Sequence, residues 1–385
     1  MVARAENPRP LLPCRRLGRS PYRYCRLAVS LYRSPPLAMT LNKSLRLAFF
    51  VPPPDHRVGG LGLAINTLGE ALQATGLTVE IDPAQIDDFD VVHFHGLWQP
   101  RFISIAKNCR RSRKPYIVSP HGMLEPWAWR HRWWKKWPYF LLVERRFLED
   151  ASAILATSQL EEQHLRHFHF KTPLATIPLG LAGNFRENYL QARSELGWSE
   201  NEFVLLYLSR IHPKKGLHLL LSALSSLRID RSQYRLVIVG DGPRDYLNWL
   251  HRFADGHQDS LPPIDWLGPI WGDLKWKYLQ AADLFCLPTQ SENFGLAILE
   301  SCQVGTPVFT TSETPWKTFL TAHKFPVARP TLKSVREMLH KFLRAGRIAP
   351  DRRRRLAQQT QTEFDWGNVS PRYLAFYARV AENAP

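Results

Sequence analysis

Short apolar runs alternate with longer amphipathic stretches from residue 45 onward, and this alternation predicts strands separated by helices. A helical stretch from about Leu61 to Thr75 follows the first run after a loop rich in Pro and Gly. The runs of the first half are Leu45–Val51, Thr78–Ile81, Val91–Phe94, Tyr116–Ser119, Ala153–Ala156 and Ala175–Ile177. Because alternating strands and helices favour a parallel sheet covered on both faces, we expect an α/β fold.

The pattern restarts near residue 200, where a helix from Gly216 to about Leu227 follows the first new run. The runs of this half are Phe203–Leu208, Tyr234–Val239, Ile264–Leu267, Leu284–Leu287 and Pro307–Thr310. Two α/β halves therefore join near residues 180–200. Ligands bind at the carboxyl ends of parallel strands, so a cleft between two such sheets is the expected site. Ser370-Pro371 has the pattern of an N-cap followed by Pro, which predicts a last helix running to about Val380.

Composition supports a folded protein with two cores. The chain has 385 residues, 44% of them hydrophobic and 22% charged, which excludes disorder throughout. No run of about eighteen apolar residues is present, so no spanning helix is expected. Five scattered cysteines without Cys-x-x-Cys spacing argue against a disulfide scaffold and a zinc site, and indicate a reducing compartment.

The net charge of +17 is concentrated in two segments. Residues 1–38 carry eight Arg and one Glu, and residues 107–146 carry eleven Lys or Arg and two Glu. These segments contribute +7 and +9, so the remaining residues sum to about +1. A basic surplus of this size usually means a phosphate-bearing partner, in nucleic acid, lipid headgroups or a nucleotide.

Residues 1–38 have six Pro and no hydrophobic period. An Arg-rich transit peptide, a disordered tail and a start codon placed too early all fit this composition. We favour the last, because Met39 directly precedes the first ordered pattern.

The strongest motif is Glu292-Asn293-Phe294-Gly295-Leu296-Ala297-Ile298-Leu299-Glu300, which follows the strand Leu284–Leu287. A helix is expected to start near Phe294 or Gly295, and its free N–H groups and positive dipole end can hold a phosphate. Glu292 and Glu300 would lie roughly 12 Å apart, about the span of a nucleotide sugar. An ordinary acidic helix, with Glu292 as a dipole partner, is the alternative.

Two further loops carry phosphate-binding chemistry. Ser209–Gly216, with Arg210 and Lys215, follows the strand Phe203–Leu208, and two cations there suit a leaving diphosphate without a metal. A solvated basic loop is the alternative. Val58-Gly59-Gly60-Leu61-Gly62 brings flexible glycines to a helix start, where the backbone could approach a phosphate, or could simply turn.

Histidines mark two strand ends in the first half. His121 lies in Ser119-Pro120-His121-Gly122, at a strand end that would face the cleft. His93 and His95 alternate along one strand and should share a face. No nearby Cys or carboxylate completes a ligand set, so we favour a structural role for His93 over a metal site.

The segment Glu125–Phe140 contains five of the thirteen Trp, interleaved with Arg and Lys. Trp prefers the membrane interface, and cations prefer anionic headgroups. Aromatic-basic mixtures also bind single-stranded nucleic acid, and a core helix with a basic outer face remains open. The residues assigned to this acceptor or membrane side are Trp127, Arg130, Arg132, Trp133, Trp134, Lys135 and Lys136.

Together these motifs resemble the retaining glycosyltransferases of family 4, which have the GT-B fold. Glu292–Glu300 resembles the family's Glu-x7-Glu signature, and Arg210 with Lys215-Gly216 resembles its diphosphate clamp. Gly59-Gly60 resembles the family's N-terminal glycine loop, and Gly240-Asp241-Gly242-Pro243 resembles its Gly-Asp-Gly-Pro turn. His93–Trp98 and His121–Lys136 resemble the corresponding segments of the branch that assembles bacterial polysaccharides and lipopolysaccharides. Trp366–Val380 is similar to the family's helix that crosses back to the N-terminal domain, so the likeness covers residues 45–382.

The resemblance implies roles for individual residues. Arg210 and Lys215 would hold the donor diphosphate, Glu292 would contact the donor sugar, and Glu300 would bind the ribose. The glycines Gly59 and Gly60 would also be on the donor side. Backbone groups of Asn293, Phe294 and Gly295 would approach the sugar and phosphate, with His121 beside the sugar. Two segments depart from the family pattern, the turn Ile177-Pro178-Leu179-Gly180 and the glycine-free Lys317–Pro330.

We therefore predict two Rossmann-like domains, residues 45–185 with the helix 366–385 on the acceptor side and residues 186–365 on the donor side, preceded by a basic extension, residues 1–44. The expected activity is metal-independent, retaining transfer of a hexose from a nucleotide-diphosphate sugar to a glycan or lipid-linked acceptor. We expect no cofactor, no nucleic-acid partner, and a cytoplasmic location on the inner face of an anionic membrane. A nucleotide-sugar epimerase and a non-catalytic protein binding anionic polymers remain the alternatives.

Overall fold

The computed structural model describes residues 44–53, 60–130, 133–181 and 188–383. All of these belong to one compact unit that contains two parallel sheets. Within the described residues, no helix is long and apolar enough to cross a membrane. The basic extension, residues 1–44, lies outside the described residues except for Ser44.

The first sheet has six parallel strands in the order β2-β1-β3-β4-β5-β6. The strands are β1 (Arg46–Phe50), β2 (Thr78–Ile81), β3 (Val91–His95), β4 (Tyr116–Ser119), β5 (Ala153–Ala156) and β6 (Leu174–Thr176). Every predicted strand of this half is confirmed to within one residue at each end. The central strands β3, β4 and β5 are wholly buried, as their continuous apolar runs indicated, because helices cover both faces, whereas the edge strand β2 is largely exposed.

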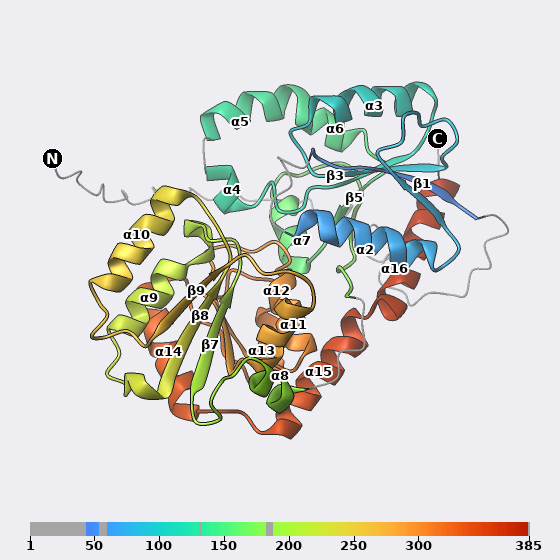
Figure 1. Cartoon of the computed structure of the whole chain (residues 1–385). Coiled ribbons are helices and arrows are strands. Elements are labelled where there is room, and N and C mark those ends of the chain that lie inside the picture. Colours follow the sequence, from blue (N-terminus) through green and yellow to red (C-terminus); the bar gives the residue numbers. More distant parts are fainter. Residues whose placement is uncertain (1–43, 54–59, 131–132, 182–187, 384–385) are drawn as a thin grey trace, which may run out of the picture. The chain divides into compact units, whose positions relative to one another are not determined.

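Helices α2 and α16 lie together on one face of this sheet, and α3, α5 and α6 lie on the other (Figure 1). The helices of this half are α2 (Leu61–Gln73), α3 (Pro100–Arg111), α4 (Pro126–Arg130), α5 (Trp133–Tyr139), α6 (Arg145–Glu149) and α7 (Gln159–Arg166). A π-helical turn, η2 (Phe140–Glu144), connects α5 to α6 without a break. The Trp-rich segment is thus largely helical.

The second sheet has five parallel strands in the order β11-β10-β7-β8-β9. These strands are β7 (Phe203–Leu208), β8 (Tyr234–Val239), β9 (Ile264–Gly268), β10 (Leu284–Leu287) and β11 (Val308–Thr310), again within one residue of the prediction. The helices are α8 (Tyr189–Glu195), α9 (Leu217–Ser225), α10 (Arg244–Asp255), α11 (Gly272–Ala281), α12 (Leu296–Gln303), α13 (Lys317–Ala322), α14 (Leu332–Ala345) and α15 (Pro350–Phe364), with short 3-10 turns η3 (Pro213–Lys215) and η4 (Arg231–Gln233). Helices α9, α10 and α14 cover one face, and α8, α11 and α12 the other (Figure 1).

The start predicted for the last helix is wrong. Helix α16 runs from Trp366 to Glu382, so Ser370-Pro371 lies inside it. Asp365 is the N-cap, because its carboxylate accepts the Gly367 N–H at 2.7 Å. The Ser370 hydroxyl donates instead to the Trp366 carbonyl at 2.6 Å. A local Ser-Pro pattern was therefore outweighed by a cap five residues earlier.

Helix α16 returns to the first sheet, as expected. The Tyr377 hydroxyl lies 2.7 Å from His93 Nδ1 on β3, and the Tyr373 hydroxyl donates to the Ile177 carbonyl at 3.4 Å. The turn that departs from the family pattern is shaped by this helix, because a Cβ on Gly180 would lie 2.5 Å from the Trp366 ring. Glycine at this position lets the indole pack directly on the backbone.

Candidate active site

Two loops of the second sheet meet at the ends of neighbouring strands. β7 and β10 are paired, so the loop after β7 and the loop after β10 emerge side by side. The Lys214 carbonyl accepts the Gln290 N–H at 2.7 Å. A Cβ on Gly216 would lie 2.0 Å from the Pro288 carbonyl oxygen, so only glycine allows this approach. The loop after β7 and the loop after β10, both predicted to bind phosphate, therefore form one continuous surface.

Lys215 and Glu292 contact each other across these loops. Lys215 Nζ lies 2.5 Å from Glu292 Oε2, and both side chains are largely buried. Arg210 is exposed, and among the described residues no hydrogen bond or ion pair engages its guanidinium. Of the two cations predicted to hold a diphosphate, one is thus paired with the predicted sugar-binding carboxylate and one is open to solvent.

Helix α12 starts at Leu296, slightly later than predicted, and its N-cap Gly295 has a left-handed backbone with φ of 81°. A Cβ at Gly295 would lie 2.9 Å from Glu292 Cγ. The Phe294 carbonyl accepts a hydrogen bond from the buried Trp316 indole N–H. The first N–H groups of α12 have no partner within the helix, as at every helix start. This backbone can therefore donate to an anion, while the carbonyl before it is already engaged.

Glu300 lies on α12 and is buried. Its Oε1 accepts a hydrogen bond from Lys275 Nζ at 2.7 Å. Burial raises the pKa of Glu300, and Lys275 opposes that shift. Glu300, the residue predicted to bind a ribose, is therefore a buried carboxylate whose negative charge Lys275 balances.

His121 comes from the first sheet, at the end of β4, and has a left-handed backbone with φ of 52°. The next residue, Gly122, contacts the loop after β10, because a Cβ there would lie 2.7 Å from Asn293 Cβ. The Ser158 hydroxyl donates to the Asn293 carbonyl at 3.2 Å, and Asn293 Nδ2 donates to Thr157 Oγ1 at 3.2 Å. The structure thus brings the His121 turn and the Glu292–Gly295 segment together.

Buried Glu161 holds this turn in place. Its carboxylate accepts the Gly122 N–H at 2.6 Å, the Thr157 N–H at 2.8 Å and the Thr157 hydroxyl at 2.9 Å. Burial raises the pKa of Glu161 to about 7, although these hydrogen bonds favour the ionised form. Glu161 therefore links the loop after β4 to the start of α7.

Glu125 makes a second connection between the loops of the two sheets. Glu125 is 2% exposed, and its Oε2 accepts the Ser291 hydroxyl at 2.5 Å and lies 3.2 Å from Lys214 Nζ. Lys214 Nζ also lies 5.3 Å from the ring centre of Trp127. Trp127, predicted on the acceptor or membrane side, thus packs against a loop of the second sheet.

Gly60 lies close to the donor-side helix, because a Cβ there would be 2.9 Å from Leu296 Cδ1. Gly59 lies outside the described residues. Gly60 is therefore the part of the predicted glycine loop that the structure brings to the start of α12.

The remaining Trp-rich segment presents both a buried and an exposed side. Trp129 packs edge-on against Trp137, Phe140 and Phe168. Trp134 is 59% exposed and Leu142 79% exposed, and Trp137 and Leu141 are also exposed. Lys136 Nζ donates to the Ala128 carbonyl at 2.6 Å. Arg132 and the side chains of Arg130, Trp133 and Lys135 lie outside the described residues.

His93 and His95 share a face of β3, as predicted, with ring centres 3.9 Å apart. His93 Nε2 lies 2.8 Å from the Ser119 hydroxyl, and His95 Nδ1 lies 3.1 Å from His121 Nε2. Burial lowers the pKa of all three histidines, that of His121 to about 4. No group of three or more His, Cys, Asp or Glu side chains within the described residues is placed to hold a metal ion.

The sequence interpretation did not identify Glu125, Glu161 or Trp316 as parts of this site. Glu161 had a local signal, because Ser158 and Glu161 have the spacing of a capping box, and the Ser158 hydroxyl does accept the Glu161 N–H. Glu125 and Trp316 had none, since their partners are distant in sequence.

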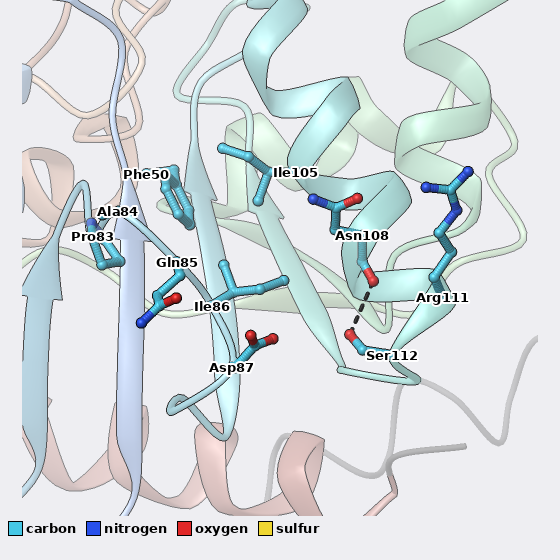
Figure 2. Close-up of a pocket in the computed structure, with 10 residues that line it drawn as sticks. All are labelled: Phe50, Pro83, Ala84, Gln85, Ile86, Asp87, Ile105, Asn108, Arg111 and Ser112. Carbon is cyan, nitrogen blue, oxygen red and sulfur yellow. Dashed lines mark hydrogen bonds between the residues drawn. The ribbon is translucent and has the colours of Figure 1, made fainter.

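A hollow of about 480 Å³ lies elsewhere, between α3 and the segment after β2 (Figure 2). It is lined by Phe50, Pro83, Ala84, Gln85, Ile86, Asp87, Ile105, Asn108, Arg111 and Ser112. None of the predicted site residues is among them. This hollow is therefore separate from the candidate site.

Comparison with known families identifies the two halves. A family model described as "Glycosyltransferase Family 4" matches residues 50–182, and one described as "Glycosyl transferases group 1" matches residues 189–362. The chain belongs to the family 4 glycosyltransferases. Both matches include site residues of this chain, His121 in the first and Arg210, Lys215, Glu292 and Glu300 in the second.

Individual proteins of this family resemble the chain over part of its length. It is 34% identical over 173 residues to the alpha-monoglucosyldiacylglycerol synthase of Streptococcus pneumoniae, covering 43% of this chain and 38% of that protein. An uncharacterized glycosyltransferase of Methanocaldococcus jannaschii is 31% identical over 246 residues, covering 59% and 58%. The chain thus spans between about two fifths and three fifths of the length of these relatives.

Solved structures show that the fold is that of the GT-B glycosyltransferases. Sucrose-phosphate synthase from Thermosynechococcus elongatus superposes with a TM-score of 0.71 at 18% identity, covering 87% of this chain and 99% of that one. Anabaena HepE in complex with UDP-glucose superposes with a TM-score of 0.68 at 18% identity, covering 87% and 100%. Two parallel sheets and a last helix that returns to the first sheet are common to the predicted and the observed architecture.

Proposed function

We propose that this protein transfers a hexose from a nucleotide-diphosphate sugar to a glycan or lipid-linked acceptor, without a metal ion and with retention of configuration. The observation that carries the proposal is the convergence of Arg210, Lys215 and the start of α12 at two neighbouring strand ends, next to Glu292. Two cations and free helix N–H groups suit a diphosphate, and a carboxylate suits sugar hydroxyls.

The proposed chemistry follows from where charge develops. When the bond between the sugar and the diphosphate breaks, negative charge grows on the leaving phosphate. Arg210, Lys215 and the N-terminus of α12 would stabilise that charge from fixed positions. We propose front-face attack, in which the leaving phosphate accepts the proton of the acceptor hydroxyl, because no carboxylate is assigned as a nucleophile. Glu292 would exchange its ion pair with Lys215 for hydrogen bonds to the donor sugar.

The relatives support the donor class. HepE is described in complex with UDP-glucose, and the named Streptococcus pneumoniae relative is a monoglucosyldiacylglycerol synthase. A nucleotide-linked hexose as donor agrees with the first description, and a lipid acceptor agrees with the second name. We extend the proposal to cell-surface polysaccharide synthesis, on the strength of the sequence resemblance stated above.

Arg210→Ala tests the assignment of the diphosphate site. We expect kcat/KM to fall roughly 10²- to 10³-fold, because one charged donor to the leaving group is lost. The measurement is transfer from a panel of UDP-, ADP- and GDP-linked hexoses to extracted lipid and glycan acceptors, with melting temperature as a second readout of donor binding. Arg336→Ala, an exposed change on α14, is the control. An Arg210→Ala enzyme with wild-type turnover would show that the clamp is elsewhere.

Donor incubated without acceptor separates transfer from epimerisation. Transfer requires the acceptor, whereas an epimerase converts the donor alone. Recovery of an isomerised donor sugar in that control would therefore contradict the transferase proposal.

We further propose that the exposed face of α5 and η2 lies on an anionic membrane. Trp134, Trp137, Leu141 and Leu142 expose apolar surface, and the surrounding segment carries the +9 charge of residues 107–146. Apolar side chains and cations on one helical face bind anionic bilayers. We expect a peripheral location on the cytoplasmic leaflet, and no nucleic-acid partner.

Vesicle flotation measures this binding. Wild-type protein should float with vesicles containing phosphatidylglycerol and much less with phosphatidylcholine alone, and Trp134→Ser should reduce flotation several-fold. Trp249→Ser on α10, where the indole is also exposed, is the matched control. Equal flotation with both vesicle types, or equal loss in both variants, would contradict a membrane-facing surface on α5 and η2.

A further inference from the structure

Buried His95, at the end of β3, and partly buried His121, just after β4, contact each other through their ring nitrogens. His95 Nδ1 lies 3.1 Å from His121 Nε2, and the two rings are nearly parallel at 17°. Burial and the neighbouring histidines lower the pKa of His95, and burial lowers that of His121 to about 4. Both rings are therefore neutral near pH 7, and each carries a single N–H. Only one of the two facing nitrogens can be the donor.

The other side of His95 decides which nitrogen donates. His95 is 1% exposed, and its Nε2 has no hydrogen-bond partner among the described residues. The neighbouring rings are Phe49, at 4.7 Å between ring centres, and His93, whose nitrogens contact Tyr377 and Ser119. A proton on His95 Nε2 would be a buried donor with at most a weak contact to the Phe49 ring. A buried donor without a partner is rarer and costlier than an unused lone pair.

His95 accordingly carries its proton on Nδ1 and donates it to His121. His121 Nε2 then acts as an acceptor, so the proton of His121 must lie on Nδ1. This tautomer is the less common one for a free imidazole. Here it follows from the surroundings of His95, whose Nε2 has no partner among the described residues to which it could donate a proton. His121 is partly exposed, and no described residue forms a hydrogen bond with its Nδ1, so this N–H can reach solvent or a ligand.

We propose that His95 is a positioning residue that holds His121 as a hydrogen-bond donor through Nδ1, directed at an oxygen of the sugar donor, a hydroxyl or phosphate oxygen. The inference rests on the proposed function for the identity of the ligand, but the tautomer itself does not. It assigns His121 a donor role in substrate binding, because a nitrogen that carries a proton cannot remove one from the acceptor hydroxyl.

The tautomer is measured directly on the unliganded wild-type protein. Selective ¹⁵N-histidine labelling and long-range ¹⁵N–¹H correlation distinguish protonated from bare ring nitrogens, and loss of a signal in His121→Asn assigns His121. We expect Nδ1 of His121 to be protonated and Nε2 bare. A His121 ring protonated on Nε2, or an equal mixture of the two forms, would overturn the proposal whether or not a variant folds.

Two substitutions of His95 then test the cause. His95→Asn keeps an N–H close to the position of Nδ1 and should retain the His121 tautomer and most of the activity. His95→Phe keeps the ring shape without a donor, and should shift His121 toward the Nε2–H form and lower kcat/KM about three- to tenfold. If His95→Phe folds and leaves the His121 tautomer unchanged, His95 does not set it.

This experiment separates the inference from the proposed function. If no donor and acceptor pair gives transfer in the wild type, the proposed function fails while the tautomer result stands. If transfer is observed and Arg210→Ala abolishes it, but His121 carries its proton on Nε2, only the inference fails.

Discussion

At the scale of single residues, buried carboxylates hold this structure together at points where the backbone is unusual. Glu144, at the end of η2, is fully buried, and its Oε1 accepts the N–H of Trp98 at 3.0 Å. Trp98 has a left-handed backbone with φ of 67°, which a large side chain rarely adopts. Glu144 Oε2 has no partner among the described residues, and burial raises the pKa of Glu144 to about 7.

Glu144→Gln should change the pH dependence of stability in a defined direction. The folded pKa of Glu144, about 7, is above the ordinary value of 4.5, so the folded state disfavours ionisation. The wild type should therefore lose stability as pH rises from 4.5 through 7, by roughly 3 kcal/mol from this group. The glutamine variant lacks this loss. Its free energy of unfolding, measured in urea, should therefore rise relative to that of the wild type between pH 4.5 and 8.

Glu337→Gln, an exposed change on α14, is the control for that series and should run parallel to the wild type. His93, His95 and His121 act in the opposite direction in the wild type, because their lowered pKa values favour the folded state as pH rises. Only the difference between variant and wild type isolates Glu144. A difference that does not change with pH would contradict the shifted carboxylate.

At the scale of elements, the start of α12 combines several constraints. Gly295 has the left-handed backbone that ends the loop, Trp316 engages the carbonyl before it, and Glu292 lies against it. The Lys317–Pro330 segment, which lacks the family's glycines, forms α13, and Trp316 immediately precedes that helix. This tryptophan packs against Phe294 with ring centres 5.6 Å apart, and Phe319 of the segment packs edge-on against Trp316, also at 5.6 Å.

Gly295→Ala should affect both stability and donor binding. A left-handed backbone costs about 1–2 kcal/mol with a side chain, and the new Cβ would press on Glu292 at 2.9 Å. Gly197→Ala is the matched control, because Gly197 has φ of 67° and no atom within 4 Å of its Cβ position. Both variants should lose stability in urea, Gly295→Ala more than Gly197→Ala because of the added contact, and only Gly295→Ala should raise the KM for the sugar donor. Equal KM values in the two variants would show that Glu292 does not contact the donor.

Elements were also the scale at which the sequence was most informative. Strands buried on both faces leave short apolar runs, and these runs located all eleven strands of the described residues within one residue. The start of α16 was predicted wrongly because Ser370-Pro371 has the sequence pattern of a helix start. The helix begins earlier, since Asp365 already caps it. The contacts of Glu125 were not predictable, since its partner Ser291 is 166 residues away and no periodicity links the two.

At the scale of the whole molecule, loops of the two sheets are joined by hydrogen bonds of buried side chains. Glu125 contacts Lys214 and Ser291, and Asn293 contacts Thr157 and Ser158. These contacts surround the predicted donor site. Binding of a donor and the association of these loops should therefore influence each other.

A double-mutant cycle on Glu125 and Lys214 measures one of these contacts. Because Glu125 is buried and Lys214 largely so, we expect a coupling energy of about 1 kcal/mol or more in urea unfolding. The exposed pair Arg110 and Asp150, within the first half of the chain, should give less than about 1 kcal/mol in the same cycle. Additive effects of Glu125→Ala and Lys214→Ala would mean that this contact is not populated in solution.

The return of α16 to the first sheet also has a consequence for biosynthesis. Tyr377 contacts His93, a residue made 284 positions earlier, so the part of the first sheet that α16 covers beside α2 stays open while the ribosome synthesises the entire second half. Domains that fold during translation usually do so in order from the N-terminus. Here the half that emerges first should be the last to be completed. A nascent chain that stops before α16 would expose β3 and α2, and would be a substrate for chaperones and proteases.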